Sequence, residues 1–270
     1  MYSSRNYKLN FKQINYFRSE GYLILPSFLE KNHKNRLRKE VDNLMKDRSN
    51  NNEKLIVSYN EMGFLTSYPP MMEILEQILG PNFILHHIHS NRHDYGMKGI
   101  HWHQDYEQYP QTNRSHLMLH VFYYLNGLNG EIGDLLILPR SHNVLSQRSL
   151  EIFGTKDLPG SISINSLPYG SAIIVHSAIW HARRQKNGGN NNPRYFIDIS
   201  YCQFGVKWPA YKELSTTEII NKKALYMGLD RGGKYLHLYD SSQFYDYKSI
   251  MDNFNDVNKG SLIKYIIKQT

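Results

Sequence analysis

Residues 101–105 read His101-Trp102-His103-Gln104-Asp105. On a β-strand, residues i and i+2 point to the same face, so His103 and Asp105 place an imidazole beside a carboxylate. A second histidine from a later strand, His181, would complete a face of two histidines and one carboxylate, the ligand set of non-heme Fe(II) oxygenases. Arg194 follows 13 residues after His181 and could hold the carboxylate of an organic co-substrate. This pattern predicts an oxygenase.

The His-x-Asp pair is a weak signal by itself. The chain has 13 histidines in 270 residues, and chance alone gives about 0.6 such pairs in a sequence of this composition. The alternative interpretation is a surface or hairpin histidine beside an unrelated aspartate. The sequence on both sides of the pair decides between the two interpretations.

The composition is that of a folded domain. Hydrophobic residues make up 40% of the chain and aromatic residues 13%, which is enough for a packed core. No apolar run approaches the ~20 residues needed to span a membrane, and the first residues lack the apolar core of a signal peptide. Cys202 is the single cysteine and cannot form an internal disulfide. We therefore expect a cytoplasmic protein with no membrane partner.

The net charge is +8, with an isoelectric point near 9.3. The basic residues are dispersed, and no basic stripe is interleaved with stacking aromatic residues, so we expect no nucleic-acid partner. A general bias toward Asn, Lys, Tyr and Ile accounts for the charge in the simplest interpretation. The other interpretation is that the charge attracts a small anionic substrate. The sequence does not specify an oligomeric state.

Helical patterns dominate the first 81 residues. Apolar residues recur at helical spacing within residues 8–21, and a short strand is expected at 22–26. Ser27 followed by Glu30 fits a capping box, which predicts that a second helix begins there. A further helix is predicted at residues 70–79, opened by prolines and closed by a glycine.

Short β-rich runs separated by turn residues occupy residues 82–205. Several short strands with turns between them are typical of a sandwich or barrel. Helices before the strands, and one after them near 215–227, would cover one face of such a domain. We therefore expect a mainly β protein with flanking helices, formed by a single domain spanning 1–270. Within it we expect packing elements at 1–81, a β core with the metal site at 82–205, and an extension at 206–270.

Four motifs follow one another in order along the chain. They are GYLILPSFL at 21–29, HQD at 103–105, GDLLILPRSH at 133–142 and GSAIIVHSAIWH at 170–181, with Arg194 before a β run. In this order they resemble the phytanoyl-CoA dioxygenase family of Fe(II)- and 2-oxoglutarate-dependent oxygenases, over roughly residues 11–205. The resemblance implies a double-stranded β-helix, which is a jelly-roll, cupin-like core.

The resemblance also implies a site and a reaction. Fe(II) would be bound by His103, Asp105 and His181, with 2-oxoglutarate and O2 as co-substrates, and Arg194 would pair with the far carboxylate of 2-oxoglutarate. The expected reaction is hydroxylation of a small molecule with release of succinate and CO2. Related halogenases have a small residue at the carboxylate position. Asp105 therefore favours hydroxylation, or a desaturation or ring closure, over halogenation.

Two departures from the family pattern stand out. Arg140 replaces the usual glycine of the turn, which is expected to change only a surface loop. After His181 the chain has Ala182-Arg183-Arg184 in place of Gly-Ser-Gly, so a hydroxyl that can bind 2-oxoglutarate is missing. Arg183 and Arg184 could line the pocket mouth and attract an anionic substrate, or they could be solvated loop arginines.

Several further residues are candidates with simpler alternatives. His176 is the rival of His181, but it lies five residues earlier and would face the other side of a regular strand. Asn91 could bind 2-oxoglutarate, or it could bond its own backbone at a strand end. Trp102 alternates with His103 and is expected in the core. Two tyrosines, Tyr106 and Tyr109, could lie over the site, although ordinary packing is the simpler expectation. We interpret the remaining candidate histidines as structural, namely His116, His120 and His142.

Two other functional hypotheses stay open at this level. A metal-binding β-barrel that does not use 2-oxoglutarate, such as a cupin-like isomerase or a sensor, would keep the three ligands but would need no arginine at 194. An inactive binding or scaffold protein of the same fold is the third hypothesis. The intact set of three ligands disfavours it.

Overall fold

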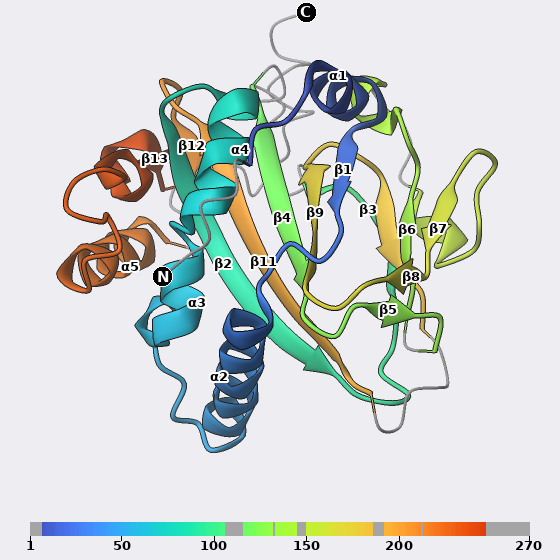
Figure 1. Cartoon of the computed structure of the whole chain (residues 1–270), viewed down its shortest axis with the longest axis horizontal. Coiled ribbons are helices and arrows are strands. Elements are labelled where there is room, and N and C mark those ends of the chain that lie inside the picture. Colours follow the sequence, from blue (N-terminus) through green and yellow to red (C-terminus); the bar gives the residue numbers. More distant parts are fainter. Residues whose placement is uncertain are drawn as a thin grey trace, which may run out of the picture.

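The computed structural model describes residues 7–105, 116–131, 133–144, 150–185, 192–211 and 213–246. Tyr106 and Tyr109 lie outside the described residues. In Figure 1 most of the helices lie along one side of a large sheet, and a smaller sheet lies on its other side. No helix in the described ranges is both long and apolar enough to cross a membrane.

Five α-helices flank the strands in the described part of the chain: α1 (Phe11–Glu20), α2 (Lys31–Ser49), α3 (Asn60–Leu65), α4 (Pro69–Leu79) and α5 (Leu214–Tyr226). The described residues also form short 3₁₀ helices: η1 (Ile56–Ser58), η4 (Ser141–Asn143), η5 (Glu151–Phe153), η6 (Leu236–Tyr239) and η7 (Ser241–Gln243). The expected helices near 8–21, 70–79 and 215–227 are thus present.

The capping box expected at Ser27 is wrong. Ser27 has a φ of 49°, in the left-handed region, and its backbone N–H donates to Ser171 Oγ at 3.2 Å. The segment is therefore a turn tied to a distant strand, and α2 begins only at Lys31. A contact made by tertiary folding has overridden the local capping signal.

The larger sheet is antiparallel and has the strand order β1-β9-β4-β11-β2. Its strands are β1 (Tyr22–Leu25), β2 (Phe83–His93), β4 (Met118–Tyr124), β9 (Ser171–His176) and β11 (Arg194–Gln203). Strands distant in the sequence are neighbours, so the site residues on them are brought together only by folding.

The smaller sheet has the order β3-β10-β6-β7 and is also antiparallel. It consists of β3 (Ile100–His103), β10 (His181–Arg183), β6 (Leu135–Ile137) and β7 (Ile162–Ile164). Two short pairs complete the strands: β5 (Leu128–Asn129) with β8 (Ser166–Leu167), and β12 (Trp208–Pro209) with β13 (Phe244–Tyr245).

The larger sheet is buried on both faces. Alternate residues of β4 belong to two different hydrophobic clusters, because successive side chains of a strand point to opposite sides. Leu119, Val121 and Tyr123 pack in the cluster that contains the helices, whereas Phe122 and Tyr124 pack with residues of the smaller sheet. Two buried faces explain why residues 117–122 are apolar except for His120. Two antiparallel sheets with covering helices are the architecture that the sequence predicted.

Candidate metal centre

The pairing of β3 with β10 brings the predicted ligands together. His103, the last residue of β3, is the direct partner of His181, the first residue of β10. Asp105 follows two residues after β3, and its backbone N–H donates to Ser177 O at 3.0 Å. This strand register therefore brings His181 next to His103 and Asp105, although it lies at least 76 positions later in the sequence.

The three side chains converge on a common point. The carboxylate of Asp105 has its Oδ1 3.8 Å from His103 Nε2 and its Oδ2 3.7 Å from His181 Nε2. One candidate ligand atom from each residue lies within 4.8 Å of those of the other two. Two imidazoles and a carboxylate at this spacing can bind a single divalent ion from one side.

Backbone carbonyls select the nitrogen that each imidazole offers. His103 Nδ1 lies 2.8 Å from His101 O, and His181 Nδ1 lies 3.1 Å from Ile179 O. A carbonyl can only accept, so Nδ1 must carry the proton in both rings. The Nε2 lone pairs are then left pointing at the space beside Asp105, as metal-binding histidines require.

The protonation states also suit a metal. Burial, reinforced by the neighbouring His103, lowers the pKa of His181 to about 4, so its ring is neutral at pH 7. Burial alone would raise the pKa of Asp105. The positive potential of His120, followed by that of His181 and His103, outweighs this effect and lowers it. Asp105 is therefore an ionised carboxylate.

His120 contacts the candidate ligands, although its sequence position suggested a structural role. Its Nε2 lies 3.4 Å from Asp105 Oδ2, and its Nδ1 lies 2.9 Å from Asp198 Oδ2. Burial lowers its pKa, but the carboxylates of Asp105 and Asp198 more than offset this and raise it to about 9. The ring is thus a cation between two carboxylates. The sequence did contain a signal for this role: His120 interrupts the apolar run of β4, and Asp198 is a charged residue within the mostly apolar β11.

A second group of possible ligands adjoins the first. His87, His120 and Asp198 also place one ligand atom each within 4.8 Å of one another. Both nitrogens of His120 already face carboxylates, however, and His87 has its Nδ1 2.7 Å from His86 Nδ1 and its Nε2 3.3 Å from Ser200 Oγ. Since these nitrogens have hydrogen-bonding partners, the group with free Nε2 atoms is the better metal site.

Arg194 lies beside the metal ligands in a cavity of about 150 Å³ that His103, Asp105 and His181 also line. The residue is only 3% exposed, and its Nη2 donates to Tyr124 Oη at 3.1 Å. Its guanidinium carbon lies 4.9 Å from the ring centre of Tyr124. Its Nε and Nη1 have no acceptor among the described residues. A buried guanidinium with unused donors is suited to a carboxylate.

Arg183 lines the same cavity. Its Nη2 donates to Lys98 O, and its Nε has no acceptor in the described part of the chain. Burial, and next the charge of Arg194, lower the pKa of Arg183 to about 10. Two buried cations that face one cavity repel each other, and an anion bound between them would remove this repulsion.

Arg184 points elsewhere. Its guanidinium pairs with Asp134 at 3.4 Å and with Asp157 at 2.5 Å. The structure therefore separates the two arginines that the sequence left together: Arg183 ends β10 and lines the cavity, whereas Arg184 follows the strand and pairs with Asp134 and Asp157.

The other candidates occupy different positions. His176 Nδ1 accepts a hydrogen bond from the backbone N–H of Ala178 at 3.0 Å, and His176 belongs to neither group of possible ligands. Trp102 is fully buried, as predicted, and donates to Lys156 O. Asn91 is half-buried opposite Phe196, and its neighbours His89 and His93 line the cavity with Arg194, whereas Asn91 does not. Its role in binding 2-oxoglutarate stays a prediction.

Arg140 occupies the turn where glycine is usual. Its φ is 68°, in the left-handed region that favours glycine. The exposed guanidinium pairs with Glu20 at 3.0 Å. The turn is thus kept with a different residue.

Comparisons with known proteins identify the family and the fold. Residues 17–189 match the family model described as phytanoyl-CoA dioxygenase. No curated protein sequence gives a significant match.

Several solved structures are similar in fold. They include the non-heme alpha-ketoglutarate-dependent epimerase SnoN from nogalamycin biosynthesis, at 16% identity and a TM-score of 0.57 over 71% of this chain and 82% of that one. HygX from Streptomyces hygroscopicus, with nickel and 2-oxoglutarate bound, is 14% identical, with a TM-score of 0.59; the match covers 74% of this chain and 90% of HygX. EctD from S. alaskensis, with 2-oxoglutarate and 5-hydroxyectoine, is 18% identical, with a TM-score of 0.57; the match covers 75% of this chain and 79% of EctD. At these identities the matches establish a shared double-stranded β-helix fold.

Proposed function

This chain belongs to the phytanoyl-CoA dioxygenase family of Fe(II)- and 2-oxoglutarate-dependent oxygenases, and from that premise we propose that it hydroxylates a small molecule. Its cofactor is iron and its co-substrate is 2-oxoglutarate. Membership of the family decides against an isomerase or sensor that makes no use of 2-oxoglutarate.

One observation carries the proposal: three metal-binding groups and two buried arginines with unused donors face the same cavity. In this proposal His103, Asp105 and His181 hold the iron on one side and leave the other side open. Bound iron would supply the oxidative chemistry, in which 2-oxoglutarate and O2 are consumed, succinate and CO2 are released, one oxygen atom of O2 enters succinate and the other enters the substrate as a hydroxyl group. The two histidines bring neutral rings and Asp105 brings one negative charge, which leaves the site cationic and receptive to an anionic co-substrate.

The arginines would bind and orient 2-oxoglutarate. Arg194 offers Nε and Nη1 to the carboxylate farthest from the metal, and Tyr124 holds the guanidinium from the other side. Arg183 would add a second positive charge in the same cavity. It would replace the hydroxyl that Gly-Ser-Gly provides in the family pattern, so the substitution at 182–184 changes how the anion is held without removing its binding site.

His120 and Asp198 would position the ligand Asp105. The cationic ring of His120 lies between the two carboxylates and limits the rotation of Asp105. Asp198 is only 3% exposed and would hold the ring in turn. Such partners of a metal ligand typically affect metal affinity or activity by about 10- to 100-fold.

Hydroxylation is the outcome that Asp105 favours. A carboxylate at this position fills the coordination site that a halide would need, so halogenation is disfavoured. Similar folds carry out different reactions: SnoN is an epimerase, whereas the EctD structure holds a hydroxylated product, 5-hydroxyectoine.

The test uses the purified protein with Fe(II) and 2-oxoglutarate under nitrogen. We expect a weak visible charge-transfer band that requires both additions. Admission of O2 should then yield succinate, and a substrate should increase its rate and appear with one added oxygen atom. The absence of both the band and succinate would overturn the proposal.

A further inference from the structure

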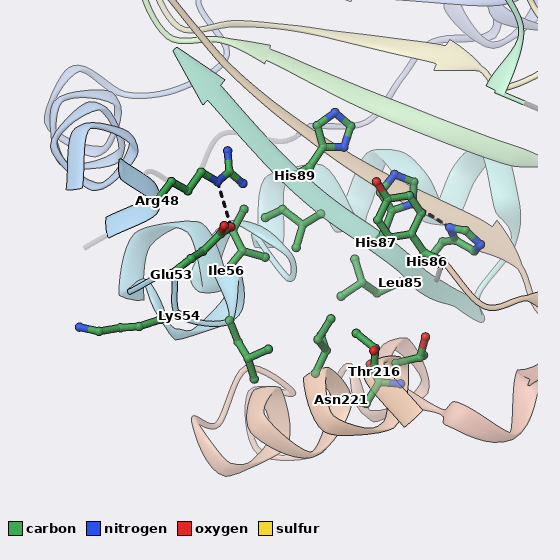
Figure 2. Close-up of a pocket in the computed structure, with 15 residues that line it drawn as sticks. Arg48, Glu53, Lys54, Ile56, Leu85, His86, His87, His89, Thr216 and Asn221 are labelled. Atoms are coloured by element: carbon green, nitrogen blue, oxygen red, sulfur yellow. Dashed lines mark hydrogen bonds and ion pairs between the residues drawn. The ribbon is translucent and has the colours of Figure 1, made fainter. Parts of the chain in front are cut away.

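The largest of the described cavities lies outside the metal centre. It has a volume of about 390 Å³, within the range for sites that hold drug-sized molecules. Figure 2 shows that it lies between β2, the segment after α2, and helix α5. Three groups of residues form its walls: Arg48 and Glu53–Ile56, Leu85–His89 of β2, and Tyr211 with Thr216, Thr217, Ile220 and Asn221.

This cavity adjoins the metal centre through shared walls. His87, His89 and Tyr211 also line a smaller cavity of about 140 Å³, which Asp105, His120 and Asp198 line as well. His89 and Asp105 then line the cavity that holds Arg194. The large cavity therefore borders the smaller cavity, and the candidate metal ligand Asp105 forms part of the wall of the smaller cavity.

The boundary between the two spaces is an aromatic stack. The rings of His87 and Tyr211 are parallel to within 7°, with centres 3.9 Å apart. His86, the residue before, has its Nε2 2.9 Å from Pro209 O. This inner end thus presents uncharged aromatic surface, since burial lowers the pKa of both histidines.

The charged residues of the wall are already compensated or point away. Arg48 Nε lies 2.9 Å from Glu53 Oε1, and Arg48 Nη1 donates to Ser90 O at 2.8 Å. Figure 2 shows this pair at one end of the cavity and shows Lys54 extending away from the other lining residues. The charges of Arg48 and Glu53 therefore offset each other, and the ammonium group of Lys54 is directed away from the cavity.

The rest of the wall is apolar with a few hydroxyl and amide groups. Leu55, Ile56, Leu85, Ile88 and Ile220 supply the aliphatic surface, and Thr216, Thr217 and Asn221 on α5 supply the polar groups. Such a wall stabilises an apolar body through burial and orients it with a small number of hydrogen bonds.

We propose that this cavity binds the primary substrate and that the substrate is an uncharged, largely apolar ring system with a small number of hydrogen-bonding groups. The proposal rests on the proposed function, because it supplies the molecule that the iron centre oxidises. It assigns a role to the extension after residue 205, whose helix α5 forms one wall. An uncharged substrate differs from the anionic substrate that the net charge of +8 suggested. The arginines with unused donors, which would bind an anion, lie in the cavity proposed for 2-oxoglutarate and not in this one.

Three small molecules that share a naphthalene ring and differ in charge test whether the cavity prefers an uncharged ligand. They are 2-naphthol, 2-naphthoate and 2-naphthylmethylammonium, which are neutral, anionic and cationic near pH 7. Equilibrium dialysis under nitrogen, against protein loaded with Fe(II) and 2-oxoglutarate, measures the affinity of each. We expect 2-naphthol to bind at least about tenfold more tightly than either charged probe.

Two substitutions on one helix test the location. Ile220→Trp fills the cavity and is expected to weaken 2-naphthol binding at least about tenfold, whereas Ile219→Trp is the control, since Ile219 is 54% exposed on the same helix. Thr216→Phe provides a second blocking variant if Ile220→Trp does not fold, as judged by circular dichroism. The Fe(II)–2-oxoglutarate band should be unchanged in all three variants.

The outcomes separate the two proposals. Equal or tighter binding of a charged probe, or no effect of the blocking variants on 2-naphthol, would overturn the substrate cavity while the band stays intact. An absent band in the unsubstituted protein would instead overturn the proposed function itself.

Discussion

At the scale of single residues, the site depends on which atom each side chain presents. The carbonyls of His101 and Ile179 turn the Nε2 atoms of two histidines toward Asp105. His120 presents both nitrogens to carboxylates and is thereby removed from the set of free ligands. Residue type alone does not distinguish these histidines, and only their hydrogen-bonding partners do.

Removal of the ligand carboxylate should abolish the reaction. Asp105→Ala is expected to lower iron-dependent succinate formation by at least about 100-fold, because two neutral imidazoles bind iron weakly and His120 loses a partner. Succinate formation measured across an Fe(II) titration checks this. The control is His101→Ala: that side chain is exposed, and only its backbone carbonyl holds His103. Full activity in Asp105→Ala would show that the ligand assignment is wrong.

The three arginines should differ in their effect on 2-oxoglutarate. Arg194→Ala is expected to raise the apparent KM for 2-oxoglutarate on the order of 100-fold, because it removes a buried charge partner of the anion. A smaller rise of about tenfold is expected for Arg183→Ala, which keeps the main partner. Arg184→Ala should leave the KM nearly unchanged, since its guanidinium pairs with Asp134 and Asp157. Steady-state kinetics with varied 2-oxoglutarate measures all three, and equal effects of Arg183→Ala and Arg184→Ala would contradict the role given to Arg183.

At the scale of elements, the pairing of β3 with β10 determines the distance between the two candidate histidine ligands. The turn before β3 contains two glycines with different tasks. A Cβ on Gly99 would lie 2.5 Å from Arg183 O, on the backbone of β10, whereas Gly96 has open space around it and a φ of 74°. Gly99 is thus needed for close approach, and Gly96 for its conformation.

This difference predicts separable effects. Gly99→Ala should push β10 away from β3, lower stability by about 1–3 kcal/mol through overpacking, and weaken Fe(II) binding because His181 moves relative to His103. Gly96→Ala should lower stability by about 1 kcal/mol through backbone strain and leave Fe(II) binding intact. Denaturant unfolding and Fe(II) titration measure the two quantities. Undisturbed Fe(II) binding in Gly99→Ala would argue against this strand pair as the element that sets the site.

At the scale of the whole molecule, several histidines are buried in the neutral form. Burial lowers the pKa of His33 and of His86 to about 4 and that of His176 to about 3. Unfolding returns each to an ordinary value near 6.5. Their contribution to stability is therefore complete above pH 6.5 and is lost as the pH falls toward the folded pKa values, because the unfolded chain then binds more protons.

His33 offers a test far from the metal. It is 1% exposed on α2 and packs against Phe64 and Tyr68. The free energy of unfolding should fall with decreasing pH between about 6 and 4.5, and His33→Leu should reduce that slope by about 1.4 kcal/mol per pH unit. The exposed His101→Leu should leave the slope unchanged. Urea unfolding at several pH values measures it, and identical slopes in His33→Leu and the parent would refute the assignment.

His120 acts in the opposite direction without disturbing this test. Its pKa is raised to about 9, so its contribution to stability is present below pH 6.5 and is lost as the pH rises through 9. Below pH 6 it is protonated in both the folded and unfolded states. His120 therefore adds little to the acid slope, and the comparison of His33→Leu with the parent isolates the part that His33 contributes.

The sequence by itself determined the family, the class of fold and the local part of the site. The motif placed His103 and Asp105 two residues apart, although β3 ends at His103 and Asp105 lies beyond it, and the order of the motifs predicted His181 and Arg194 as further site residues. The buried strands could be read because their apolar runs reflect burial on both faces.

Only the tertiary structure decided which neighbours each polar side chain has. The register of β4, β11 and β2 brings His120, Asp198 and His87 beside Asp105, and the direction of β10 sends Arg183 into the cavity and Arg184 out of it. The cavity beside α5 likewise joins segments from three parts of the chain. These facts depend on strand register and on the packing of distant segments, and neither is encoded in the spacing of nearby residues.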